Sequence, residues 1–213
     1  MRLVICIFAV SALLSGAVVL DRIAVIAGTH VIKLSDIDRD IRLTDFLNNE
    51  PLSFNSTAKR QAAERLITQQ ILRDEIVSGG YRRATDEQAA GLEADLRRDR
   101  FGGSGQRLRQ ALERDGLSEA QLHAQLLWQL TVLQFINQRF RAGAVVTPEE
   151  VRDYYDEHYA ELQKKYPKDN SLEAMEPVIR PMLENQQINQ DFNEWLDQAR
   201  KNERVQFKDG AFE

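Results

Sequence analysis

Apolar residues recur at intervals of three and four residues through most of the chain, which is the spacing of amphipathic helices. The pattern predicts helices over 35–50, 57–78, 85–101, 106–114, 118–141, 147–162 and 172–201. Because Pro177 and Pro181 interrupt the last of these, its first turn is expected either at Leu172 or nearer Pro177.

Two of these helices carry well-defined apolar stripes that predict their buried faces. The stripe of the helix over 57–78 comprises Leu66, Ile67, Ile71 and Val77. The stripe over 118–141 comprises Leu122, Leu126, Leu127, Leu130, Leu133, Ile136 and Phe140. Trp128 and Phe135 lie off the centre of the second stripe.

Polar residues with capping chemistry stand at several predicted helix starts. Thr85 and Thr147 each have a Gln or Glu three residues later, which is the spacing of a capping box. Ser35 is expected to cap the first helix by accepting from the amide of Asp38. The chain is therefore predicted to be mainly helical.

Short alternating segments at the two ends of the chain predict a small sheet. Residues 21–33 indicate two short strands joined at Gly28, and Val205 to Phe207 indicates a third. We expect an antiparallel sheet that joins the N-terminal hairpin to the C-terminal strand. Residues 172–213 would then pack back on the N-terminal part of a single domain, 18–213.

Residues 1–17 have the pattern of a secretory signal peptide. Arg2 precedes an apolar run, and small residues at Ser15 and Ala17 fit a cleavage site. The alternative is an uncleaved membrane anchor reaching to about residue 20, because such a run can just span a bilayer. Cleavage would remove Cys6, the single cysteine of the chain.

The composition of the chain argues against several classes of partner and site. The 213 residues include 28 Lys and Arg against 33 Asp and Glu, and the net charge is −5. This balance argues against nucleic acid as a partner, since phosphate binding needs an excess of positive charge. One cysteine excludes a disulfide framework within the chain and a thiolate-rich metal site.

No motif for catalysis, metal binding or nucleotide binding is evident. His30, His123 and His158 stand apart without the spacing of a metal site. The glycine run 102–105 follows a helix and precedes no Lys-Ser or Lys-Thr pair, so it does not indicate a phosphate-binding loop. The sequence predicts no cofactor, no metal and no catalytic residue.

Several segments, in their order along the chain, resemble SurA-like periplasmic chaperones. The resemblance is carried by Val18 to Gly28, Val31 to Asp38, Leu66 to Leu72, Thr85 to Gln88, Leu117 to Glu119, Val146 to Tyr155, and Ile179 through Leu196 to Val205. It covers nearly all of the chain after residue 17. It implies a SurA N-terminal-like helical chaperone domain.

The resemblance implies an ATP-independent periplasmic chaperone that binds unfolded or nascent envelope proteins. Relatives such as PrsA and PpiD carry parvulin-type prolyl isomerase domains ahead of the closing helix, where this chain has only a connector over 164–171. We therefore expect no isomerase activity. The alternatives are a peptidyl-prolyl isomerase and a non-catalytic envelope adaptor or dimerisation module, and a homodimer is left open.

Holding an unfolded client requires exposed apolar and aromatic side chains that bind weakly and at several points. The apolar stripes leave over four aromatic residues that are candidates for such a surface, although each would equally fill a core: Phe46, Phe54, Phe101 and Tyr154.

Overall fold

The computed structural model describes residues 21–208 and 210–212. Within them the chain forms eight helices and a three-stranded sheet, so the prediction of a mainly helical fold with a small sheet is confirmed. The predicted signal segment lies outside the described residues. The helices are α1 (Leu34–Asn48), α2 (Ser56–Ser78), α3 (Asp86–Phe101), α4 (Gly105–Arg114), α5 (Glu119–Phe140), α6 (Pro148–Glu157), α7 (Tyr159–Lys165) and α8 (Leu172–Asn202).

The sheet joins the two ends of the described chain, as predicted. Its strands are β1 (Ile23–Ala27), β2 (His30–Lys33) and β3 (Val205–Phe207), in the order β2-β1-β3 with antiparallel pairing throughout. Val25 pairs with Ile32 on one side and with Phe207 on the other. After β3, Phe212 returns to the core beneath the sheet.

The predicted alternation along β1 is only partly correct. Ile23 is exposed, whereas Ala24 and Val25 are both fully buried. The register of β1 against β2 shifts between Ile23 and Val25, and such an irregularity turns the preceding side chain to the other face. The turn to β2 follows at Gly28, which has a φ of 56°.

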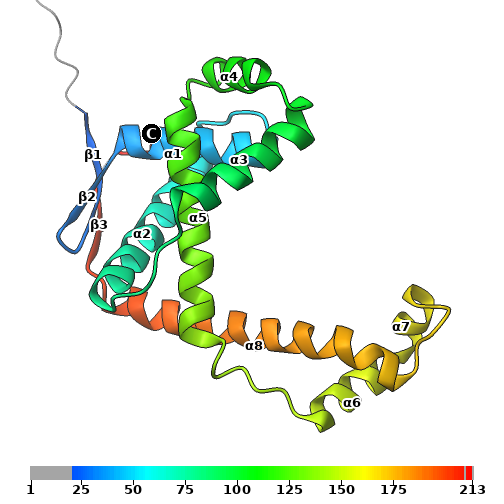
Figure 1. Cartoon of the computed structure of the whole chain (residues 1–213). Coiled ribbons are helices and arrows are strands. Elements are labelled where there is room, and N and C mark those ends of the chain that lie inside the picture. Colours follow the sequence, from blue (N-terminus) through cyan, green and yellow to red (C-terminus); the bar gives the residue numbers. More distant parts are fainter. Residues whose placement is uncertain (1–20, 209, 213) are drawn as a thin grey trace, which may run out of the picture.

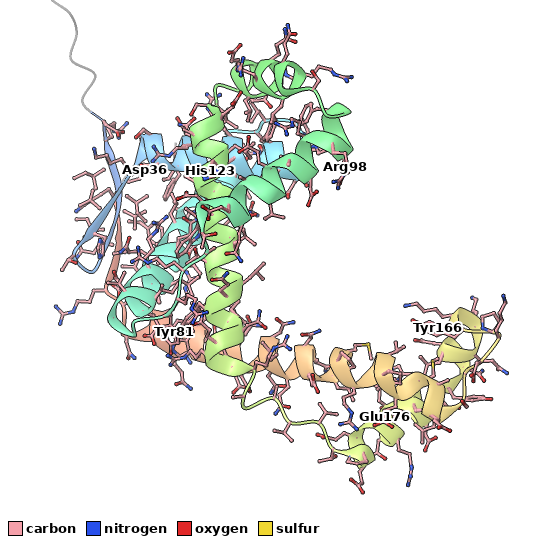
Figure 2. The ribbon with its side chains drawn as sticks, viewed as in Figure 1. Asp36, Tyr81, Arg98, His123, Tyr166 and Glu176 are labelled. Atoms are coloured by element: carbon pink, nitrogen blue, oxygen red, sulfur yellow. The ribbon has the colours of Figure 1, made fainter. Side chains whose placement is uncertain are left out.

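The structure has a helical body and a projecting arm (Figure 1). We use "body" for the sheet, α1 to α5 and the C-terminal half of α8, and "arm" for residues 146–183. The arm has a core of its own, made of Val146, Val151, Leu162, Met175 and Ile179. Figure 2 shows Tyr166 and Glu176 in the arm, at a distance from Arg98 and His123 in the body.

Helix α8 links the arm to the body. Its N-terminal half packs on α6, and its C-terminal half contacts α5 and α2. It begins at Leu172, capped by Ser171, so of the two predicted starts the earlier is correct. Pro177 and Pro181 are both exposed, and water can therefore satisfy the carbonyl oxygens that each proline leaves without a donor.

The first turn of α1 is capped differently from the prediction. The helix begins at Leu34, directly after β2, and the carboxylate of Asp36 accepts from the amide of Lys33 at 3.0 Å. Ser35 lies inside this first turn, and its hydroxyl donates to Asp21 instead. The predicted caps at Thr85 and Thr147 are both confirmed as capping boxes.

The predicted buried faces of α2 and α5 are wrong at three positions. Val77 and Leu133 were expected in the core but are 61% and 56% exposed, whereas Phe135 is fully buried. Phe135 lies against Tyr81, which follows α2, and against Trp195 of α8. These partners come from distant segments, so they turn a different face of α5 inward than its own periodicity indicates.

Candidate functional site

The structure separates the four aromatic residues predicted to bind clients. Phe46 and Phe101 stack with ring centroids 6.3 Å apart, and Phe46 is only 4% exposed. Phe54 packs on the main core of the body with Arg42 over its ring. Tyr154 stacks on His158 within the arm. Only Phe46 and Phe101 are brought together, and the four share no common surface.

A different aromatic residue, Trp128 of α5, stands where three cavities of the described structure meet. Their volumes are about 410, 380 and 600 Å³, and Trp128 lines all three. The first two also share Arg73 and Ala124, and the first and third also share Gln69 and Gln125, so the three cavities adjoin at Trp128. We call this surface the Trp128 groove; it is lined by Gln69, Arg73, Val77, Gln125, Trp128 and Leu133, with Asp40 at its α1 end.

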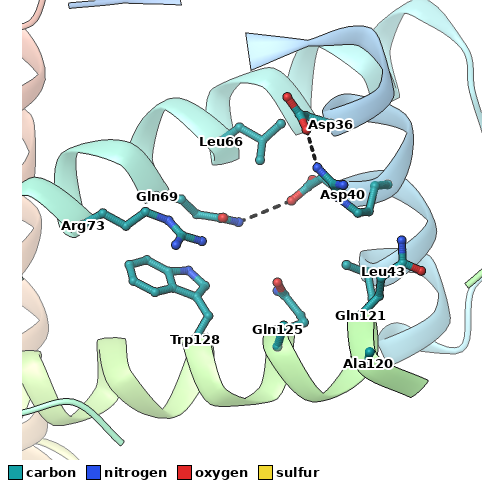
Figure 3. A pocket seen from close by; sticks show the side chains of 12 residues that line it. Asp36, Asp40, Leu43, Leu66, Gln69, Arg73, Ala120, Gln121, Gln125 and Trp128 are labelled. Atoms are coloured by element: carbon teal, nitrogen blue, oxygen red, sulfur yellow. Dashed lines mark hydrogen bonds and ion pairs between the residues drawn. The ribbon is translucent and has the colours of Figure 1, made fainter. Parts of the chain in front are cut away.

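Small residues along α5 make room for the groove. Ala120 and Ala124 precede Trp128 at four-residue steps, so all three lie on one side of the helix. Figure 3 shows the Trp128 ring next to Arg73, with Asp36 and Asp40 at the opposite end of the cavity. The guanidinium carbon of Arg73 lies 4.4 Å from the Trp128 ring centroid, which favours a cation–π interaction.

The groove also exposes apolar side chains outside the core. Leu133 and Val77 are its most exposed apolar residues, while Trp128 and Val132 are half-buried. Glutamine side chains, including Gln69 and Gln125, also line the groove. Such a surface combines apolar contact area with adaptable hydrogen-bond donors and acceptors, which suits an extended peptide of variable sequence.

Asp40 is a buried carboxylate at the α1 end of the groove. Arg65 donates to Asp40 with Nη2 and Oδ2 2.6 Å apart, and Gln69 donates to its other oxygen at 3.4 Å. Desolvation by burial nevertheless outweighs these favourable partners and raises the pKa of Asp40. The carboxylate thus ties α1 to α2 at some cost in desolvation.

The raised pKa of Asp40 predicts how stability depends on pH. Because the folded chain binds this proton more tightly than the unfolded chain, lowering the pH through the folded pKa favours the folded state. The unfolding free energy of the unmodified protein, relative to Asp40→Asn, should therefore rise between pH 7 and about pH 4. Urea unfolding at several pH values measures this difference.

A matched control removes another acid from the same helix. The control is Asp38→Asn, because Asp38 lies outside the groove and forms no ion pair with any other described residue. The comparison with this variant separates the effect of Asp40 from the general effect of one lost charge. A difference between the unmodified protein and Asp40→Asn that stays constant or falls as pH is lowered would contradict the prediction.

The histidines do not form a site. His30 pairs with Asp74, His158 stacks on Tyr154, and His123 lies between Asp86 and Glu93, joining α5 to α3. In the part of the chain that the structure describes, no group of three or more His, Cys, Asp or Glu side chains could hold a metal ion. Nor is any helix of that part long and apolar enough to cross a membrane.

Comparison of the chain with known protein families and with curated proteins found no match.

The Trp128 groove was not predicted from the sequence, although one signal for it was available. Trp128 lies off the apolar stripe of its helix, the same property that made Phe46 and Phe101 candidates. What the sequence lacked was the position of α2, whose Arg73 and Gln69 complete the wall.

Proposed function

We propose that the protein is an ATP-independent chaperone of the periplasm that holds unfolded envelope proteins without isomerising prolyl bonds. The observation that carries this proposal is the Trp128 groove, a set of three adjoining, partly apolar cavities whose described lining residues include no cluster that could hold a metal ion. The ordered sequence resemblance to SurA-like chaperones supports it. Exported proteins reach this compartment unfolded, and a holding chaperone there works without ATP.

The groove can hold a client weakly, as release requires. Burial contributes about 25 cal/mol per Å² of apolar surface. A few client side chains packed against Trp128 and Leu133 would therefore contribute a few kcal/mol at most. Weak contacts gain strength when one client is held at several places. The arm offers a second such place, because Tyr159, Val178 and Met182 are exposed there.

The segment between α6 and α8 supports the absence of isomerase activity in this proposal. It contains only α7 and a short loop, Tyr166 to Asn170. A domain needs about 50 residues or more. Tyr166 of this segment instead packs on the core of the arm, and the hydroxyl of Tyr155, in α6, donates to the carbonyl of Asn170 at 2.8 Å.

Aggregation of a urea-unfolded outer-membrane protein after dilution, followed by light scattering, tests the proposal. We expect the purified protein to suppress aggregation at stoichiometric amounts. Replacing Val77 and Leu133 together with serine should weaken suppression about fivefold, because two exposed apolar contacts of the groove are lost. Both side chains are largely exposed, so the variant should fold normally.

Val145→Ser provides the matched control, because Val145 is 70% exposed and lies outside the groove. It should suppress aggregation as the unmodified protein does. Absence of suppression by the unmodified protein would contradict the proposal. Acceleration of prolyl isomerisation in a protease-coupled peptide assay would favour the enzyme instead, and capture of a single envelope partner in place of many clients would favour the adaptor.

A further inference from the structure

One end of the Trp128 groove carries two positive charges, and none of the described residues that line this end is acidic. The cavity of about 380 Å³ there is lined by Arg73 of α2 and Arg83 of the following loop. Its remaining walls are largely apolar and include Val77, Leu127 and Trp128. Neither arginine has a carboxylate partner among the residues that the structure describes.

The other arginines of the groove differ in this respect. Arg65 pairs with the buried Asp40, and Arg39 and Arg200 pair with Asp36 and Glu64. Each of these cations is neutralised by an acid that lines the same groove or its edge. The excess charge of the groove is therefore local, and it belongs to the Arg73–Arg83 end.

Arg73 is oriented by its contact with Trp128. Its guanidinium lies over the Trp128 ring, which orients the planar group and reduces the entropy lost on binding. Desolvation, and after it the charge of Arg83, lower the pKa of Arg73. The guanidinium stays charged at neutral pH, and an anion placed between the two arginines would relieve their repulsion.

We propose that this end of the groove binds an acidic side chain within an otherwise apolar, extended segment of an unfolded client. The carboxylate lies between Arg73 and Arg83, and its apolar neighbours lie on Trp128 and Val77. This inference rests on the proposed chaperone function and names the kind of client segment that the groove selects.

Two features favour an internal acidic side chain over other anions. The apolar walls around the arginines suit a carboxylate on a hydrocarbon stem better than a free inorganic anion. The cavity also adjoins the cavity of about 410 Å³ at Arg73, Ala124 and Trp128, so a bound chain can extend beyond it rather than end there. In an extended chain every second side chain faces the same way, so apolar residues two positions from the acid reach the groove.

Fluorescence anisotropy with labelled apolar peptides tests the inference. Three peptides, blocked at both ends, differ only in carrying Glu, Gln or Lys at the centre. At low ionic strength we expect the Glu peptide to bind about tenfold more tightly than the Gln peptide, since a charge-assisted contact to arginine is gained. The Lys peptide should bind most weakly, and added salt should reduce the differences.

Variants locate the effect. Replacing Arg73 and Arg83 together with glutamine should remove the preference for Glu over Gln while the Gln peptide still binds. Arg82→Gln is the matched control, because Arg82 neighbours Arg83 in the same loop but does not line the cavity. It should keep the preference.

Equal binding of the Glu and Gln peptides, with aggregation suppression intact, would overturn this inference and leave the chaperone proposal standing. If the unmodified protein fails to suppress aggregation but still prefers the Glu peptide, the chaperone proposal would be contradicted and this preference would stand. A fourth peptide has the central Gln and a free C-terminal carboxylate. If it bound more tightly than the blocked Glu peptide, the occupant would be a chain end, and the inference would be overturned.

Discussion

Phe135→Ala is expected to lower the free energy of unfolding by about 3–5 kcal/mol, the range for removing a fully buried aromatic side chain. Phe135 is fully buried between three segments of the body. The centroid of its ring lies 4.9 Å from that of Tyr81, edge-on, and 5.5 Å from that of Trp195, and the ring of Phe140, farther along α5, lies 6.1 Å away. The substitution therefore opens a cavity where α2, α5 and α8 meet. Urea unfolding followed by circular dichroism measures the loss.

Leu133→Ala serves as the control because it truncates a large side chain two residues away on the same helix. Leu133 is more than half exposed, so its truncation should change stability by no more than about 0.5 kcal/mol. Similar losses for the two variants would contradict the structure, because they would place both side chains in the same environment. A larger loss for Leu133→Ala would restore the buried face that the sequence predicts.

Ile179→Ala should destabilise the arm by about 2–5 kcal/mol while leaving the body folded. Ile179 is fully buried at the centre of a core that includes only four other buried side chains, all from residues 146–183. So small a core has little else to stabilise it. Hydrogen exchange should therefore become at least about tenfold faster in α6, α7 and the first half of α8.

The same measurement supplies its own internal reference. Amides of α2 and α5 belong to the body and should exchange at unchanged rates. Met182→Ala, which truncates an exposed residue of α8, should change exchange in neither part. Faster exchange spread evenly over body and arm in Ile179→Ala would show that the two parts unfold together, contrary to the expectation from their separate cores.

Local chemistry made helix starts predictable. Thr85 and Thr147 cap their helices because the hydroxyl and the partner three residues later are close in the sequence. The pairing of the terminal strands was also predictable, since both segments have alternating apolar residues. The failure at Ser35 is equally local. Asp36 satisfies the Lys33 amide, and the helix therefore starts one residue earlier.

The buried faces and the candidate site were not predictable, because they depend on which helices become neighbours. The stripe of α5 predicts that Leu133 is buried and places Phe135 off its centre, whereas the approach of Tyr81 and Trp195 buries Phe135 and leaves Leu133 exposed. The groove has the same origin. Trp128 and Arg73 are far apart in the sequence, and only the packing of α5 beside α2 places the ring under the guanidinium.

The central position of β1 has a consequence for the order of folding. Its pairing with β2 closes a loop of a few residues, whereas its pairing with β3 joins Val25 to Phe207 across almost the whole described chain. Contacts so distant in sequence form slowly, because most of the chain must be ordered first. Until Val205 to Phe207 arrive, one edge of β1 has backbone groups without partners and can accept a strand from another molecule. Pairing with β3 covers this edge, so the period before β3 arrives is when the folding chain can aggregate through β1.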